Sequence, residues 1–211
     1  MTIQLFAFDT PNGRKISVAL EEMGLPYEVR VVDITKGEQN DPAFVAISPN
    51  RKIPAIIDTD GPGGRPISVF ESGAILLYLG QKSGRFWPRD IAAQVPVLEW
   101  LMFQMGGFGP NPGQVHHFIA LENEAERRYG LQRFMTETRR LYGVMNERLA
   151  TREHFAGDLS IADFAILGWA WRHPRHKVDL AEFPNVKRWY DAMMARPGVA
   201  RGFAVALRRT G

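Results

Sequence analysis

The chain has 211 residues, which is enough for one large domain or two small ones that bury a core without disulfides. Hydrophobic residues make up 45% and charged residues 23%, and this balance excludes an intrinsically disordered chain. Lysine and arginine exceed aspartate and glutamate by only 26 to 23, so the sequence offers no basic stripe for nucleic acid.

The sequence contains no cysteine. This excludes a disulfide, a thiolate metal site and a Cys-x-x-Cys redox pair within the protein, so any thiol chemistry must use the sulfur of a ligand. The first residues lack the pattern of a secretion signal, and no stretch approaches the roughly 18 apolar residues of a membrane span. We therefore expect a cytoplasmic protein without a membrane partner.

The N-terminal third begins with a strand and a helix. Residues 3–8 form a short apolar run that ends in the turn and cap residues 9–13, so a strand and then a loop are expected. Apolar residues recur at helical spacing within residues 15–23, and Gly24 ends that pattern. The alternating residues 27–32 then predict a second strand.

A hairpin and a helix follow. Residues 55–58 and 67–70 are short strands joined by the glycine-rich residues 60–64, and a helix is expected from Ser72 to Gly84. A parallel β-α-β unit followed by a β-β-α unit describes a small mixed sheet with helices on it. Residues 1–84 therefore predict an α/β thioredoxin-like domain with four strands.

From residue 91 onward the strand pattern disappears. Long helices are expected over residues 92–105, 125–149 and 161–171. The predicted organisation is a first domain over 1–84, a linker over 85–90 and an all-α domain over 91–211.

Residues 106–113, rich in glycine and proline, either end a helix or shape a cleft wall. Ser160 and Asp163 fit a capping box, and we assign that pair to folding.

Two loops carry the chemistry: Thr10-Pro11-Asn12-Gly13 before the first helix, and Asn50-Arg51-Lys52-Ile53-Pro54-Ala55 before the third strand. In a thioredoxin-like fold both approach the start of the first helix, where free amides and the helix dipole favour an anion. A ligand thiolate would be stabilised there, with Thr10 and Asn12 as hydrogen-bond donors to the sulfur. The alternative for both residues is a turn with an N-cap.

Three further positions suit an extended peptide. A cis Ile53–Pro54 bond would turn the peptide groups of Ile53 outward, where a bound peptide can pair with them; the cis state is a hypothesis. Ser72 can donate to a carboxylate, and Glu71 can accept from an ammonium group, which together match one amino-acid head group.

Gln39 and Lys52 can hold a second carboxylate at the other end of such a ligand, although ordinary loop polarity is the alternative for each. A tripeptide with an α-amino-carboxylate end, a central thiol and a second carboxylate satisfies all of these groups. Glutathione has that layout.

The chain resembles the glutathione transferases over nearly its whole length, and the nu class above all. The resemblance rests on residues 10–13, 48–55, 70–75 and 160–163, with residues 106–110, 113–118 and 137–142 closest to nu-class sequence. In that class, which is similar to bacterial disulfide-bond oxidoreductases, a Thr-Pro-Asn loop stands where other transferases carry a catalytic tyrosine, serine or cysteine.

The resemblance implies glutathione sites and a quaternary structure. It implies one or two glutathione molecules, or oxidised glutathione, bound by these residues: Thr10, Asn12, Gln39, Lys52, Ile53, Glu71, Ser72 and Arg133. Arg133 would reach the site from the second subunit of a homodimer; the alternative is a solvated or ion-paired arginine. His116 and His117, read as adjacent loop histidines without a third ligand, do not predict a metal.

Three functions stay open at this point. The first is a glutathione-dependent enzyme that reduces disulfides through the bound thiolate, with a possible peroxidase side activity. The second is glutathione conjugation to small electrophiles, with the same site. The third is a non-catalytic glutathione-binding module, because a fold does not guarantee an activity.

Overall fold

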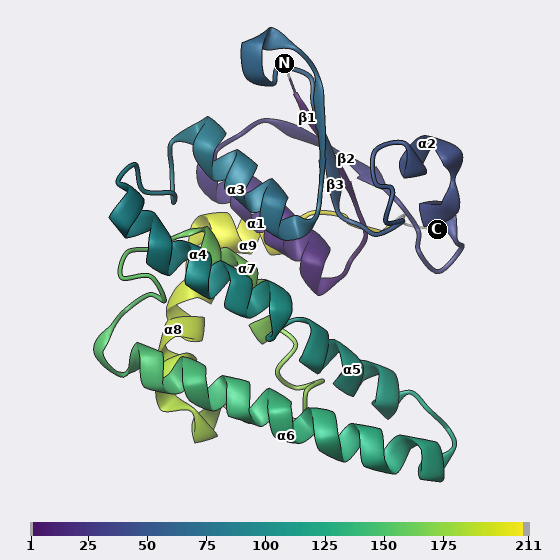
Figure 1. Ribbon diagram of the computed structural model, residues 1–211, viewed down its shortest axis with the longest axis vertical. Helices are drawn as coiled ribbons and strands as arrows, with labels where there is room; N and C mark the ends of the chain where they lie inside the picture. The colour runs from purple at the N-terminus through teal and green to yellow at the C-terminus, as the bar shows by residue number, and fades with distance from the viewer. Residues whose placement is uncertain (1, 209–211) are drawn as a thin grey trace. The chain divides into compact units, whose positions relative to one another are not determined.

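The computed structural model describes residues 2–208, which divide into two compact units. One unit comprises residues 2–87 and 195–208, and the other comprises residues 88–194. Figure 1 follows the chain through both. None of the helices formed by the described residues is long and apolar enough to cross a membrane.

Within the described residues, the first unit is built on a four-stranded mixed sheet in the order β2-β1-β3-β4. The strands are β1 (Ile3–Ala7), β2 (Tyr27–Val31), β3 (Ala55–Asp58) and β4 (Ile67–Phe70). Leu5 of β1 pairs with Val29 of parallel β2 and with Ile56 of antiparallel β3. β3 and β4 form the antiparallel hairpin that the glycine-rich connector predicts. The thioredoxin-like arrangement is confirmed.

The helices of this unit are α1 (Pro11–Met23), α2 (Pro42–Val45), α3 (Ser72–Ser83) and α9 (Pro197–Ala204). α1 and α3 lie together on one side of the sheet and α2 lies on the other (Figure 1). Gly24 and Gly84 end α1 and α3 with φ of 68° and 65°, a left-handed conformation that glycine adopts without a Cβ clash.

Apolar side chains fill both faces of the sheet. On the side of α1 and α3, Leu5, Ile16 and Ile75 are fully buried. The other side holds a cluster of buried residues with partly buried neighbours: Val32, Phe44, Ala55, Phe6, Ile47 and Ile53. Ile53 is thereby held by packing directly before β3.

α9 packs closely on α1. A Cβ built on Gly202 would stand 2.5 Å from the Cα atom of Val18, so the crossing requires glycine. The helical domain was predicted over residues 91–211, whereas the structure groups residues 195–208 with the sheet. The reason is this α1–α9 contact between segments about 180 residues apart, which no local pattern reveals.

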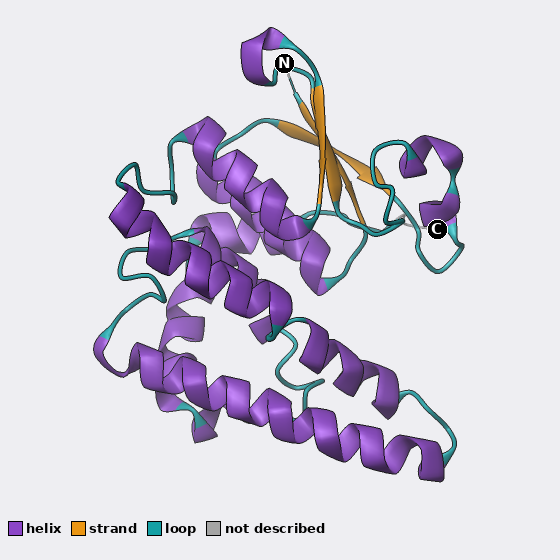
Figure 2. Ribbon diagram, in the orientation of Figure 1, coloured by secondary structure: helices purple, strands orange, loops and turns teal. Residues whose placement is uncertain are grey.

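The second unit consists of helices and connecting loops in its described residues (Figure 2). Its helices are α4 (Ile91–Gly106), α5 (Pro110–Ile119), α6 (Glu124–Arg148), α7 (Ile161–Ala170) and α8 (Pro184–Met194). α5 packs on α6, α4 packs on α7, and α8 contacts both α6 and α7. Its core includes the buried aromatic residues Phe108, Tyr142, Phe155, Phe164 and Trp189. The predicted all-helical character is confirmed.

Short 3-10 turns complete the described chain at Glu38–Asn40, Pro62–Gly64, Leu149–Thr151 and Leu180–Glu182. The capping box before α7 is present: Ser160 Oγ accepts from the Ala162 amide at 3.3 Å, and Asp163 Oδ2 accepts from the Ser160 amide at 3.0 Å. The buried Asp163 carboxylate also accepts from Trp189 Nε1 at 3.0 Å, which agrees with its predicted role in folding.

One prediction about the second unit is wrong. His116 and His117 were expected on a loop, but they lie in the last turns of α5. The glycine- and proline-rich segment does end α4 at Gly106, and Pro110 then begins a new helix, because proline is well tolerated in a first helical turn.

Candidate functional site

The loop between β1 and α1 places Thr10 as the N-cap of α1. Thr10 Oγ1 accepts from the Gly13 amide at 3.2 Å and donates to the Phe8 carbonyl over a longer 3.4 Å. Asn12 follows, half-buried, in the first turn. The N-cap interpretation of Thr10 is therefore confirmed, and among the described residues its hydroxyl hydrogen makes a long bond to a carbonyl.

Gly13 allows this loop to be tight. A Cβ at this position would stand 2.3 Å from the Phe8 carbonyl oxygen, well inside van der Waals contact. A larger residue would push the start of α1 away from the end of β1. The Thr-Pro-Asn-Gly sequence thus fixes the position of the first amides of α1, where the helix dipole is positive.

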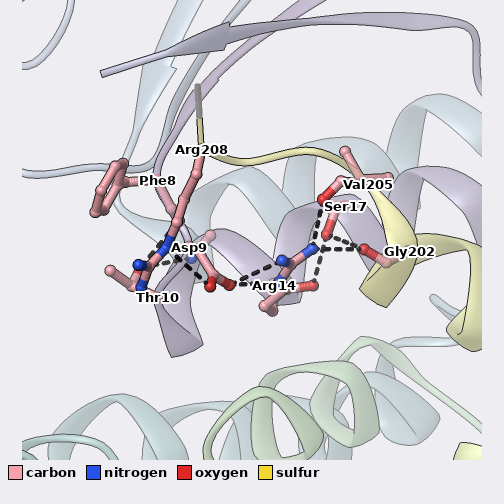
Figure 3. Close-up of polar contacts among 9 residues, drawn as sticks. Phe8, Asp9, Thr10, Arg14, Ser17, Gly202, Val205 and Arg208 are labelled. Atoms are coloured by element: carbon pink, nitrogen blue, oxygen red, sulfur yellow. Dashed lines mark hydrogen bonds and ion pairs between the residues drawn. The ribbon is translucent and has the colours of Figure 1, made fainter. Parts of the chain in front are cut away.

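Arg14 and Asp9, which the sequence analysis did not single out, fasten this loop (Figure 3). The Arg14 guanidinium binds Asp9 Oδ1 through Nε at 2.9 Å, and it also donates to the carbonyls of Gly202 and Val205. Arg208 lies on the other side, with its Nε 3.2 Å from Asp9 Oδ2. The residues before Thr10 are thus anchored to the segment after α9, a link that sequence spacing cannot show.

The loop before β3 places Lys52 and Ile53 just ahead of the first residue of this inner strand. The Ile53–Pro54 peptide bond is cis, as hypothesised. Ser48 Oγ donates to the Lys52 carbonyl at 2.8 Å and shapes the turn, while the Lys52 side chain is exposed. Gln39 lies in the 3-10 turn after β2, and its buried Oε1 has no hydrogen-bond partner within the described residues.

Glu71 and Ser72 lie at the junction of β4 and α3. Glu71 has φ of 69°, an uncommon conformation for a residue with a side chain, and it stands at the N-cap position of α3. Asn50 Nδ2 donates to Glu71 Oε1 at 3.5 Å, so the loop before β3 meets the start of α3. Ser72 is the first residue of α3 and is 4% exposed.

Lys15 connects α1 to this junction. Its Nζ donates to Ser72 Oγ at 3.1 Å, and the side chain is 1% exposed. Burial lowers the pKa of the Lys15 ammonium from 10.5 to about 7, and the negative charge of Glu71 opposes that shift. Lys15 was not predicted as a buried residue, because a lysine in the first turns of a helix usually faces solvent.

Arg133 belongs to the second unit and lies exposed on α6. It lines a cavity of about 660 Å³ with Tyr129, Phe134 and Glu137 among its neighbours. The pKa of Glu137 lies below its ordinary value because Arg140 donates hydrogen bonds to it, with a smaller contribution from the charge of Arg133. Arg133 is therefore a solvated arginine within the described chain.

Two histidines of the second unit, His116 and His176, belong to a stacked aromatic group with Trp169. The rings of His116 and His176 lie 5.0 Å apart, and Tyr142 Oη is 3.0 Å from His176 Nδ1. Burial lowers the pKa of His116 to about 4 and that of His176 to about 3, so both are neutral at neutral pH. Among the described residues, no three histidine or acidic side chains are grouped so that they could hold a metal ion.

Family models match both parts of the chain. The glutathione S-transferase N-terminal domain matches residues 10–82, and the glutathione S-transferase C-terminal domain matches residues 110–197. The first match contains Thr10, Asn12 and the α3 junction.

Individual relatives match over almost the full length. The disulfide-bond oxidoreductase YfcG of Escherichia coli is 44% identical over 209 residues, which span 97% of this chain and 95% of the relative. A glutathione transferase from Burkholderia graminis, solved with two glutathione molecules per subunit, is 42% identical with a TM-score of 0.91, over 99% and 90% of the two chains.

A Pseudomonas putida glutathione transferase, solved with one glutathione disulfide per subunit, is 40% identical with a TM-score of 0.91, over 97% and 92% of the two chains. A thioredoxin-like unit, a helical unit and these matches lead to one assignment: the chain belongs to the glutathione S-transferase superfamily, among relatives of the disulfide-bond oxidoreductase type.

Proposed function

We propose that this protein is a glutathione-dependent enzyme that reduces disulfides through the thiolate of bound glutathione. The proposal rests on one combination of observations. The chain has no cysteine, and along its length it matches a disulfide-bond oxidoreductase and a transferase solved with glutathione disulfide. Since the chain has no thiol, the nucleophilic sulfur must come from the co-substrate.

In this proposal each predicted residue holds one part of glutathione. The thiolate lies at the start of α1, where the helix dipole and the donors of Thr10 and Asn12 stabilise negative charge. Glu71 and Ser72 bind the ammonium and carboxylate of the γ-glutamyl end. Gln39 binds the glycyl carboxylate through the N–H groups of its side-chain amide, and Lys52 binds it through its ammonium group.

The backbone of Ile53 pairs with the peptide groups of glutathione as a neighbouring strand would. Packing of the Ile53 side chain against the cluster beneath the sheet holds that backbone in place.

The reaction proceeds in two thiol–disulfide exchanges. The glutathione thiolate attacks one sulfur of the substrate disulfide, forms a mixed disulfide and releases the other sulfur as a thiolate. A second glutathione thiolate attacks the glutathione sulfur of the mixed disulfide and releases the second substrate thiolate with glutathione disulfide. Two glutathione molecules thus supply the two electrons, and both released thiolates take up protons from solvent according to their pKa values.

The test is the reduction of bis(2-hydroxyethyl) disulfide by glutathione, followed by coupling to glutathione reductase. Wild-type protein is expected to accelerate the reaction, and Asn12→Ala to lower kcat. Thr151→Ala, at an exposed threonine in the second unit, is the matched control and should keep the wild-type rate. No acceleration by the folded wild-type protein would refute the proposal.

Conjugation is the second candidate, because both family models carry the transferase description. An activated thiolate also attacks electrophilic carbon and peroxide oxygen, so conjugation and the peroxidase side activity of the first candidate would use the same site. Turnover of 1-chloro-2,4-dinitrobenzene and cumene hydroperoxide, measured beside the disulfide, ranks the three reactions. Glutathione binding without turnover of any of them would favour the non-catalytic binding module.

We also infer a homodimer in which Arg133 reaches the glutathione site of the partner. A row of exposed apolar side chains on α4 supports the dimer, because such a row typically marks a surface that a partner covers. The exposed fractions of Ile91, Val95 and Met102 are 77%, 49% and 51%. Light scattering should give twice the chain mass for wild type and a lower mass for Val95→Glu. Arg133→Ala should raise the KM for glutathione, whereas Arg128→Ala, at an exposed arginine of the same helix, should not.

A cytoplasmic location is part of the proposal, because the cytosol keeps glutathione reduced and the enzyme needs the reduced form.

A further inference from the structure

Residues 205–208, which follow α9, run along the loop that begins α1 (Figure 3). Arg14 Nη1 donates to the Val205 carbonyl at 2.9 Å. Leu207 is 1% exposed, and its Cδ1 lies 3.5 Å from the place that a Cβ would take on Gly13. Two contacts therefore hold this segment against the Thr-Pro-Asn-Gly sequence that caps α1.

Arg208 closes the part of this segment that the structure describes, and its side chain is 64% exposed. Its Nε lies 3.2 Å from Asp9 Oδ2, and its guanidinium carbon lies 5.4 Å from the centre of the Phe8 ring. Phe8 and Asp9 directly precede Thr10 in the chain. The structure thus places an accessible positive charge next to the residue that is proposed to hold the glutathione sulfur.

The Asp9 carboxylate does not need Arg208 for its neutralisation. Arg14 already contacts Asp9 Oδ1 through Nε at 2.9 Å and through Nη2 at 2.8 Å, and the Arg14 side chain is 10% exposed. An exposed ion pair such as the one with Arg208 usually adds little to stability. One carboxylate and two guanidinium groups leave one net positive charge, which the exposed Arg208 presents to solvent.

The guanidinium of Arg208 is suited to a second carboxylate. A guanidinium group is planar, keeps its charge throughout the pH range of folded proteins, and has five N–H donors that can bind both oxygens of a carboxylate. The contact with Asp9 is made through Nε, and most of the side chain stays open to solvent. None of the glutathione contacts proposed above uses Arg208, so its charge is available to the other substrate.

We propose that Arg208 is a specificity-determining residue that selects disulfides with a carboxylate two carbons from the sulfur. The inference rests on the proposed disulfide reduction and names the class of its second substrate. A two-carbon arm spans about 4 Å, similar to the distance of about 3.8 Å between consecutive Cα atoms. A substrate whose sulfur meets the glutathione thiolate at Thr10 therefore brings such a carboxylate as far as Asp9, where Arg208 lies.

The expected effect depends on the charge of the substrate. The bonds that form and break in the two exchanges are the same for every disulfide, so Arg208 acts through the binding of the substrate arm. Loss of its charge should lower kcat/KM for a carboxylate substrate roughly three- to tenfold. A neutral disulfide should change little, and a disulfide with ammonium groups should react as fast or faster, because a repulsion is removed.

The test uses three disulfides with the same two-carbon arm: 3,3′-dithiodipropionate, bis(2-hydroxyethyl) disulfide and cystamine, whose arms end in a carboxylate, a hydroxyl and an ammonium group. Their glutathione-dependent reduction is coupled to glutathione reductase, and the uncatalysed rate is subtracted for each. Arg208→Gln should lower kcat/KM for 3,3′-dithiodipropionate alone.

Arg201→Gln is the matched control. Arg201 is 59% exposed and is ion-paired with Glu21, which lies in the last turn of α1, at the opposite end of this helix from Thr10. This variant should keep the wild-type kcat/KM for all three substrates.

Ionic strength gives a measurement that needs no variant. Salt screens exposed charges, so the wild-type ratio of kcat/KM for 3,3′-dithiodipropionate to that for bis(2-hydroxyethyl) disulfide should fall at least about twofold between about 0.02 and 0.5 M NaCl. The fall should be smaller in Arg208→Gln. A ratio that stays constant or rises with salt in the wild-type protein would overturn the selection by Arg208.

The remaining outcomes separate this inference from the proposed function. An equal loss of activity on all three disulfides in Arg208→Gln, or no loss on 3,3′-dithiodipropionate, would overturn the role of Arg208 and leave disulfide reduction standing. Failure of the folded wild-type protein to accelerate the reduction of any of the three would overturn the proposed function, and this inference with it.

Discussion

Substitution of Thr10 separates its observed role as an N-cap from its proposed role as a donor to sulfur. Thr10 Oγ1 accepts from the Gly13 amide at 3.2 Å, and only the hydroxyl hydrogen can serve a thiolate. Alanine removes both functions. Aspartate keeps an acceptor for the cap but has no donor and brings a negative charge to the start of α1.

The expected sizes of the two effects differ. Loss of the cap in Thr10→Ala should cost about 1 kcal/mol of unfolding free energy, or roughly 2–4 °C in Tm for a chain of this size. Loss of a hydrogen bond to a charged sulfur costs about 1.5–3 kcal/mol, which corresponds to roughly a 10- to 150-fold lower kcat/KM. Thr10→Asp should keep the wild-type Tm within about 1 °C, because Asp is as good a cap as Thr, and should be less active than Thr10→Ala.

The assay pairs thermal unfolding with the pH profile of glutathione-dependent disulfide reduction. In both variants the rate should need a higher pH, because the thiol of bound glutathione loses stabilisation of its thiolate. Thr10→Ser keeps the hydroxyl and should stay near wild type in both measurements. A stable Thr10→Asp protein with the wild-type rate would refute the proposed role of the Thr10 hydroxyl.

Three further substitutions test how the structure holds the site. Gly13→Ala should lower the unfolding free energy by about 2 kcal/mol or more in urea titrations, since its Cβ would meet the Phe8 carbonyl at 2.3 Å; a variant as stable as wild type would contradict this contact. Arg14→Met leaves Asp9 without its buried partner and should cost about 3 kcal/mol, with weaker glutathione binding in calorimetry; unchanged stability and affinity would show that the anchor is dispensable. Asp163→Ala should destabilise by about 2–3 kcal/mol without a change in KM for glutathione in the remaining folded protein, and a selective rise in KM would argue against a purely structural role.

The strands and the longer helices could be predicted because their apolar residues recur at the spacing of a strand or a helix, and these residues form the face that is buried. β3 and β4 have the predicted bounds, with the glycine-rich connector between them. α8 and α9 were not predicted, since each is short and begins with a proline that reads locally as a break in structure. The placement of α9 on α1 depends on contacts between the two ends of the chain.

The local structure around the proposed site was predictable where a motif combines turn chemistry with a helix start, as at Thr10 and Ser72. Residues whose role depends on burial, or on a partner far away in the sequence, could not be predicted. Lys15 is a polar residue in an amphipathic helix, and only the packing of α1 on α3 shows that it is buried beside Ser72. Arg14 binds carbonyls 188 and 191 positions away, which no spacing rule anticipates.

The sulfur of bound glutathione is proposed to be the nucleophile of an enzyme that has no cysteine thiol. The most direct measurement compares the initial rate of bis(2-hydroxyethyl) disulfide reduction, above the uncatalysed rate, with equal concentrations of glutathione and of cysteinylglycine. Cysteinylglycine keeps the thiol and the glycyl carboxylate but lacks the γ-glutamyl group that Glu71 and Ser72 are proposed to bind. We expect acceleration with glutathione and little or none with cysteinylglycine. Equal acceleration with both thiols, or none with glutathione, would contradict glutathione as the source of the nucleophile.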